Sequence, residues 1–144
     1  MSGNEQDELR ELATRLHAAS IRLLRTLRRE DDGTGLSAPR LSALSVVAFV
    51  GPLSLTELAA AEQVRPPTMS RIVDALVETG LVTREAAPGD RRSVRIAATR
   101  KGVRLMEEGR ERRVRALVER LGGVSDADRR ALLCAIGTLE QVAR

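Results

Sequence analysis

The sequence predicts a mainly α-helical fold with one small β-hairpin. Apolar residues recur at helical spacing through most of the 144 residues, and only two short segments have the composition and the intervening turn of a hairpin. The chain has 42% hydrophobic residues but no Trp or Tyr and a single Phe. A core can therefore form, and it must be aliphatic. The length fits a single domain over residues 1–144.

The first helix is expected over residues 5–29. One apolar stripe repeats there at spacings of three and four, formed by Leu9, Leu12, Leu16, Ala19, Leu23 and Leu27. Residues 30–35 have the composition of a loop. A second helix is expected to begin after Ser37, a candidate N-cap, and to end at Gly51-Pro52.

Two short helices separated by a tight break are expected next. Ser54 and Glu57 have the spacing of a capping box at the start of the first helix, over residues 54–62. The second, over residues 67–79, begins with Pro66-Pro67, and proline is tolerated in a first helical turn. Such a pair is typical of a helix-turn-helix.

A β-hairpin is expected directly after this pair. Residues 81–85 and 93–97 favour strands, and the residues 87–90 between them place proline and glycine where a type II turn requires them. A hairpin in this position is a wing, and its tip carries the segment Asp90-Arg91-Arg92. We therefore predict a winged helix-turn-helix core over residues 37–98.

The C-terminal segment, residues 99–144, is expected to form two helices. Thr99 and Ser125 are candidate caps, and Gly122-Gly123 separates the helices. The leucine stripes of residues 5–29 and 99–144 are too long for so small a domain to cover. We interpret both segments as dimerisation helices of a two-fold homodimer.

The positive charge of the chain is concentrated in its middle. Residues 65–104 contain nine basic and four acidic residues, so 9 − 4 = +5, whereas the whole chain has a net charge of +4. All but one of the basic residues is arginine, whose planar fork pairs with phosphates and base edges bidentately. An arginine hairpin beside a helix-turn-helix suits insertion into the minor groove. This pattern favours double-stranded DNA as the partner.

With these elements in order, nearly the whole chain resembles the MarR (multiple antibiotic resistance regulator) family of bacterial transcription factors. The most specific parts are the segment Thr68 to Leu76, then Gly80-Leu81-Val82, and Asp90-Arg91-Arg92-Ser93. The resemblance implies that Arg92 enters the minor groove while Asp90 orients it. It also implies that Thr68, Ser70 and Arg71 face the major groove or its phosphates.

The same resemblance implies a repressor that binds an inverted-repeat operator as a homodimer. Many relatives are released from DNA by a small molecule. Because this chain has no Tyr or Trp to line an aromatic pocket, a small hydrophobic or anionic effector and no effector at all remain equal expectations.

Phosphate contacts are expected from Arg65, Arg84 and Arg95, with Arg91 beside Arg92 at the wing tip. The two prolines depart from the small polar caps that are common in the family, and they remove two backbone donors that could hold a phosphate. Arg65 is expected to replace those donors, and Pro67 to lie against DNA with its ring near a thymine methyl. The alternative for Thr68 and Ser70 is hydrogen bonding to their own helix, and for Arg71 simple solvation.

Other classes of function lack residues to support them. One histidine, His17, and one cysteine, Cys134, cannot build a Cys/His metal site or an intrachain disulfide, and we find no phosphate loop or catalytic constellation. We therefore expect no enzyme activity, metal or cofactor. A polar N-terminus and an interrupted apolar stretch over 41–55 predict a cytoplasmic protein without a membrane span. Cys134 is expected to be buried in packing.

Two rival interpretations remain at this stage. Winged helices also serve as protein-interaction or adaptor modules that do not contact DNA. An adaptor has no reason to concentrate a charge of +5 in residues 65–104. Non-specific architectural DNA binding would differ from regulation only in its ratio of specific to non-specific affinity.

Overall fold

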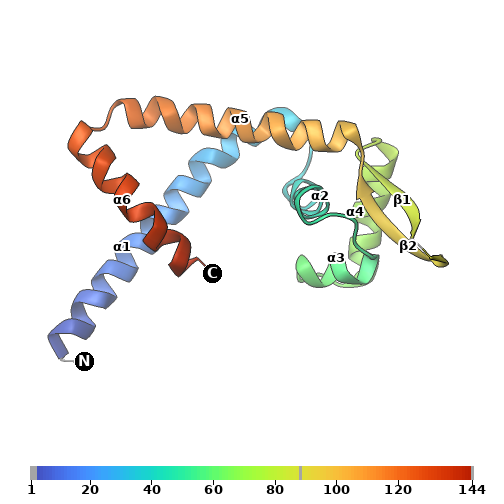
Figure 1. The fold of residues 1–144 in the computed structure, drawn as a ribbon, viewed down its shortest axis with the longest axis horizontal. Helices are drawn as coiled ribbons and strands as arrows, with labels where there is room; N and C mark the ends of the chain where they lie inside the picture. The colour runs from blue at the N-terminus through green and yellow to red at the C-terminus, as the bar shows by residue number, and fades with distance from the viewer. Residues whose placement is uncertain (1–2, 88, 144) are drawn as a thin grey trace. The chain divides into compact units, whose positions relative to one another are not determined.

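The computed structural model describes residues 3–87 and 89–143, without the side chains of residues 90–92. The chain divides into a helical unit, Met1–Glu30 with Glu111–Arg144, and a winged unit, Asp31–Arg110. The elements in order are α1 (Gly3–Arg28), the 3₁₀ helix η1 (Arg29–Thr34), α2 (Ala38–Val50), α3 (Leu55–Ala61), α4 (Pro66–Glu78), β1 (Val82–Ala87), β2 (Asp90–Ala98), α5 (Arg100–Gly122) and α6 (Asp126–Val142) (Figure 1). The predicted mainly α-helical fold with one hairpin is confirmed.

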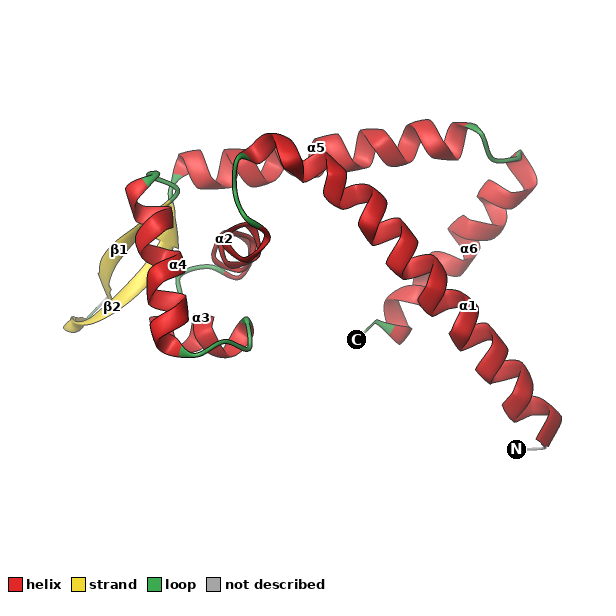
Figure 2. Ribbon diagram, turned by 180° about the vertical axis from the view of Figure 1, so that it is seen from behind, coloured by secondary structure: helices red, strands yellow, loops and turns green. Residues whose placement is uncertain are grey.

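The winged unit joins α2, α3, α4 and the first part of α5 to an antiparallel hairpin (Figure 2). β1 and β2 pair from Val82 opposite Ala98 toward the turn, with an irregularity between Ala86 and Ala87. Leu53 forms a short bridge to Ile96, because each backbone N–H donates to the other's carbonyl, at 3.1 and 2.7 Å. The chain between α2 and α3 is thereby held against the hairpin.

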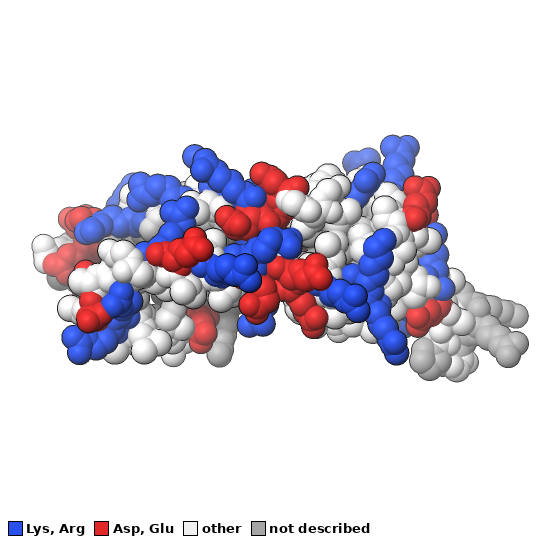
Figure 3. Space-filling model, turned by 90° about the horizontal axis from the view of Figure 1, so that it is seen from above, with Lys and Arg blue, Asp and Glu red and all other residues white. Residues whose placement is uncertain are grey.

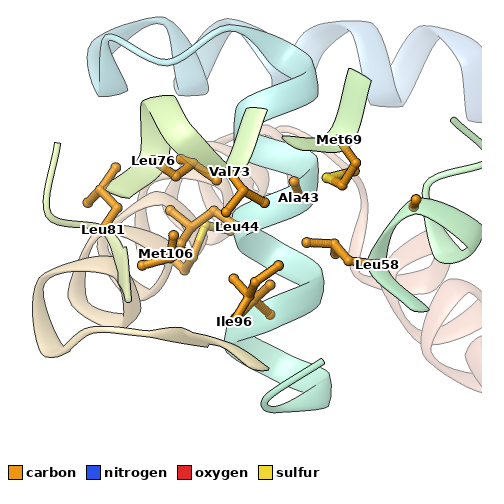
Figure 4. Close-up of a cluster of buried hydrophobic side chains, with 12 residues drawn as sticks. Ala43, Leu44, Leu58, Met69, Val73, Leu76, Leu81, Ile96 and Met106 are labelled. Atoms are coloured by element: carbon orange, nitrogen blue, oxygen red, sulfur yellow. The ribbon is translucent and has the colours of Figure 1, made fainter. Parts of the chain in front are cut away.

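An aliphatic core fixes α4 within the winged unit. The largest fully buried side chains are Leu44, Leu58, Met69, Leu76, Ile96, Val47 and Val73, and they come from α2, α3, α4 and β2. In Figure 4, the labelled side chains of Leu44, Leu58, Met69, Val73, Leu76 and Ile96 lie in one cluster, together with Leu81 and Met106. Burial of each such side chain contributes roughly 1.5–3 kcal/mol, so α4 cannot turn about its axis without exposing Met69, Val73 and Leu76.

The local signals at helix starts were confirmed at α3 and only partly at α2. Glu57 N–H donates to Ser54 Oγ at 3.2 Å, and Ser54 N–H donates to Glu57 Oε2 at 2.8 Å, which completes the predicted capping box. Ser37 occupies the N-cap of α2, but its side chain makes no capping hydrogen bond. The segment expected as a loop over residues 30–35 is mostly the 3₁₀ helix η1. Glycine and acidic residues therefore did not prevent a short helix there.

The start of α5 holds the end of α4. Lys101 Nζ donates to the Thr79 carbonyl at 2.7 Å, and Thr99 Oγ1 donates to the Gly80 carbonyl at 2.7 Å. Thr99 Oγ1 also accepts the N–H of Gly102 at 3.1 Å, so it caps α5 as predicted. These bonds satisfy carbonyls that the end of α4 would otherwise leave without partners.

The helical unit has no buried core of its own. Neither α1 nor α6 contains a buried residue, and Leu12, Val118 and Leu133 are 63%, 61% and 74% exposed. Cys134 in α6 is also exposed, so the expectation that it is buried was wrong. The reason is that no part of the chain that the structure describes buries this apolar stretch of α6. The predicted uncovered leucine stripes are therefore present.

Within the described residues, no single helix is both long enough and apolar enough to cross a membrane. Only α1 with η1 and α2, taken together as a broken span, meets the same criteria of length and composition.

Candidate nucleic-acid interface

The outward face of α4, together with its N-cap residue, carries half of the residues predicted to contact DNA. Arg65, Pro67, Thr68 and Arg71 are exposed, and Ser70 is half-buried beside the core residue Met69. The burial of Met69, Val73 and Leu76 on the opposite side keeps this face directed outward. The structure thus brings the five predicted residues together at the first half of one helix.

The charge of this face changes along α4. Arg65 and Arg71 lie at the start, whereas the acids Asp74 and Glu78 lie in the second half. A polyanion is attracted to the first half and repelled by the second, unless the acids are paired. The beginning of α4 is therefore the part that can approach a phosphate backbone.

The backbone at this end of α4 offers no hydrogen-bond donor. Pro66 and Pro67 have no N–H. The N–H groups of Thr68 and Met69 both donate to the carbonyl of Arg65, at 3.0 and 3.1 Å. The residues Pro66 to Met69 therefore offer an anion no free backbone N–H, and the role of Arg65 as a phosphate contact stays a prediction.

Two of the predicted phosphate contacts already have partners within the chain. Arg84 on β1 forms an ion pair with Asp74 on α4, with Nη2 at 2.5 Å from Oδ1. Arg95 on β2 is half-buried, and its Nη1 donates to the carbonyl of Pro52 at 3.0 Å. The first interaction joins the wing to α4, and the second joins the wing to the segment before α3.

The role of Asp74 was missed in the sequence. Asp74 and Arg84 are ten residues apart, and no local pattern relates them. They meet because Gly80, with φ of +70°, allows a sharp exit from α4 into β1. The opposite charges of Asp74 before Gly80 and Arg84 after it were the signal in the sequence from which this ion pair could have been predicted.

The wing tip lies at the limit of what the structure describes. The backbone of Asp90, Arg91 and Arg92 begins β2, but their side chains lie outside the described residues. Gly89 has φ of +83°, the positive value that a type II turn requires at its third residue. The expected roles of Asp90, Arg91 and Arg92 therefore stay predictions.

One face of the molecule carries charges of both signs. On the face shown in Figure 3, basic and acidic side chains are interspersed.

Glu57 has its pKa held below 4.5, because it accepts hydrogen bonds from the backbone and side chain of Ser54. Among the described residues, no group of His, Cys, Asp and Glu is arranged to hold a metal ion.

A hollow of about 390 Å³ lies within the winged unit, away from the outward face of α4. Three leucines, Leu36, Leu81 and Leu105, line it together with Lys101, Arg104 and Glu108. Its lining combines apolar surface with two cations and one acid.

Comparisons with known proteins agree with this architecture. A model of the MarR family matches residues 36–94. An uncharacterized HTH-type transcriptional regulator of Mycobacterium leprae is 38% identical over 122 residues, which are 85% of each chain. The structure of a MarR family protein from Bacillus stearothermophilus covers 99% of this chain and 98% of its own, with 27% identity and a TM-score of 0.77. A variant of MepR from Staphylococcus aureus bound to an oligodeoxyribonucleotide covers 92% of this chain and 98% of its own, with 15% identity and a TM-score of 0.71.

Proposed function

Since the chain belongs to the MarR family of transcriptional regulators, we propose that it is a sequence-specific repressor that binds an inverted-repeat operator as a homodimer in the cytoplasm. The observation that carries this proposal is the outward face of α4, where Arg65, Thr68 and Arg71 are held by a buried aliphatic core. The DNA-bound MepR structure supports the same binding mode by its likeness of fold.

Each predicted residue has a role in this binding mode. Thr68, Ser70 and Arg71 meet base edges or phosphates in the major groove, with Pro67 against the groove wall. Arg65 contacts a phosphate at the start of α4, and Arg84 and Arg95 contact phosphates beside the wing. Arg92 enters the minor groove, oriented by Asp90, and Arg91 lies next to it at the tip. Phosphate contacts then supply most of the affinity, and base contacts select the register.

The helical unit supports the homodimer. α1 and α6 expose apolar side chains without a buried residue, which a second copy of the same helices can cover around a two-fold axis. The two copies of α4, as recognition helices, would then enter successive major grooves about 34–36 Å apart. The operator must therefore be an inverted repeat.

Regulation by a small molecule is the last part of the proposal. The hollow in the winged unit has leucines for an apolar body and Lys101 and Arg104 for an anionic group. A hydrophobic or anionic effector that binds here would act on the segment where α5 holds the end of α4. Such a contact could change the position of the recognition helix.

The test is binding of the purified protein to its own upstream DNA, to a scrambled duplex, and to duplexes selected from a random library, across a salt titration. A specific duplex bound more than about 10³-fold tighter than the scrambled one supports a regulator. Equal affinity for upstream and scrambled DNA, with no sequence enriched from the library, would reject specific binding and leave the adaptor or architectural role.

A further inference from the structure

The first turn of α4 presents an apolar surface without hydrogen-bond donors in its backbone. The rings of Pro66 and Pro67 are exposed, and the next two N–H groups are bonded to the Arg65 carbonyl at 3.0 and 3.1 Å. This turn cannot donate from its backbone to a phosphate or to a base. Preference for proline in a first turn explains why the prolines are tolerated, but not what their exposed rings meet.

Pro67 lies on the same face of α4 as Arg71. The two residues are four positions apart, so they are neighbours on the helix surface, opposite the buried Met69 and Val73. Arg71 carries the charge that brings this face to DNA. A DNA surface that receives Arg71 in the proposed complex therefore lies next to the ring of Pro67.

The major groove offers one apolar group to such a ring. Base edges there present hydrogen-bond donors and acceptors, apart from the 5-methyl group of thymine. A proline ring over guanine would bury the O6 and N7 acceptors without a donor, which is unfavourable. Over the 5-methyl group of thymine, the ring removes apolar surface from water, and the O4 acceptor beside the methyl group can stay hydrated.

We propose that Pro67 is a specificity-determining residue that selects one thymine in each half-site through its 5-methyl group. The inference rests on the proposed function, because it requires the outward face of α4 to lie in the major groove. It goes further by assigning a base preference to a side chain that can form no hydrogen bond.

The test begins with duplexes selected from a random library by the full chain. In the selected duplex, each thymine is replaced in turn by deoxyuridine, which removes the methyl group and keeps the base pair. At one thymine position per half-site, this replacement should weaken binding of the protein about fourfold, the factor that corresponds to one buried methyl-sized group. Replacement in both half-sites should cost about 16-fold. At the same position, 5-methylcytosine should bind about fourfold tighter than cytosine.

A matched pair of variants separates this role from helix stability. Pro67→Ala removes the ring at the second residue of α4, and Pro39→Ala removes an exposed ring at the second residue of α2. Pro67→Ala should bind the thymine and deoxyuridine duplexes with equal affinity, whereas Pro39→Ala should keep the difference. Thermal unfolding of both variants checks that they are folded.

The outcomes distinguish the inference from the function on which it rests. If a duplex is selected but deoxyuridine is neutral at every position, or if Pro67→Ala retains the preference, the assignment to Pro67 is wrong and the regulator remains. If no sequence is selected at all, specific DNA binding itself fails, and the thymine assignment fails with it.

Discussion

The arginines of the winged unit differ in the partners that they already have within the chain. Arg84 is paired with Asp74, and Arg95 donates to the Pro52 carbonyl. Within the described residues, the side chains of Arg65 and Arg71 form no hydrogen bond or ion pair. A partnered arginine gains less from a phosphate, because it exchanges one charge-assisted hydrogen bond for another. Arg65 and Arg71 are therefore more available to DNA in the proposed complex than Arg84 and Arg95.

The wing tip provides a prediction at the scale of one residue. Arg92→Ala removes the side chain proposed to enter the minor groove, where the negative potential is strongest. Operator binding should weaken by about 1–3 kcal/mol, as measured by fluorescence anisotropy with a labelled duplex.

The matched control for Arg92 is an arginine on α1. Arg15 is 81% exposed and lies only 3.9 Å from the carboxylate of Glu11. Arg15→Ala removes the same charge from a helix outside the winged unit, so it should leave operator affinity nearly unchanged. Equal losses in the two variants would mean that net charge, rather than the wing, determines affinity.

The helices and strands could be predicted where a local sequence signal coincides with a physical requirement. Ser54 and Glu57 predicted the start of α3, because a capping box is complete within four residues. Ser37 predicted the N-cap position of α2 but not a capping hydrogen bond, since a serine hydroxyl has other orientations available. The pairing of Asp74 with Arg84 depends on how α4 meets β1, which no local pattern encodes. The outward face of α4 was predictable because helical periodicity alone determines which residues are buried.

The junction between the hairpin and α5 depends on one glycine. A Cβ atom at Gly102 would lie 2.2 Å from the backbone carbonyl oxygen of Leu81 and 3.1 Å from Leu44 Cδ1. Because a backbone oxygen cannot move aside cheaply, Gly102→Ala should force α5 away from β1. We expect a loss of roughly 1–3 kcal/mol in the free energy of unfolding, measured by urea denaturation.

Gly33 provides the comparison for Gly102. A Cβ atom at Gly33 would meet nothing within 4 Å. Gly33→Ala should therefore be neutral, or stabilise by up to about 1 kcal/mol, because alanine restricts the unfolded chain. A destabilisation of similar size in both variants would show that steric overlap at the Leu81 carbonyl is not the cause.

The capping box of α3 gives a prediction about pH. The pKa of Glu57 is lowered in the folded state by hydrogen bonds from Ser54. A carboxylate with a lowered folded pKa stabilises the protein above its unfolded pKa, and this stabilisation disappears as the pH falls through the folded pKa. Wild type should therefore have a higher Tm than Glu57→Gln at neutral pH, and the difference should shrink as the pH falls below the ordinary glutamate range and vanish only once the pH is below the lowered folded pKa. A difference that does not change with pH would contradict the role of the charge.

At the scale of the whole molecule, the two units have different requirements. Among the described residues, the buried hydrophobic core lies in the winged unit, from Ala43 to Met106. Neither α1 nor α6 of the helical unit has a fully buried residue, so their apolar stripes need a surface from another chain. A homodimer satisfies that requirement and also doubles the number of DNA contacts. Affinity for an inverted repeat would therefore depend on α1 and α6, although the proposed base contacts lie in the winged unit.

The salt dependence of operator binding tests this coupling of dimer and DNA. If each half-site uses three or four phosphates, log K should fall against log salt concentration with a slope of about −5 to −7. Arg65→Ala removes one phosphate contact from each protomer, so the slope should become less steep by about 2, and specific and scrambled duplexes should lose similar affinity. Pro67→Ala carries no change of charge and should leave the slope as it is. A wild-type slope near −3 would indicate that only one half-site is engaged, which would contradict the homodimeric complex.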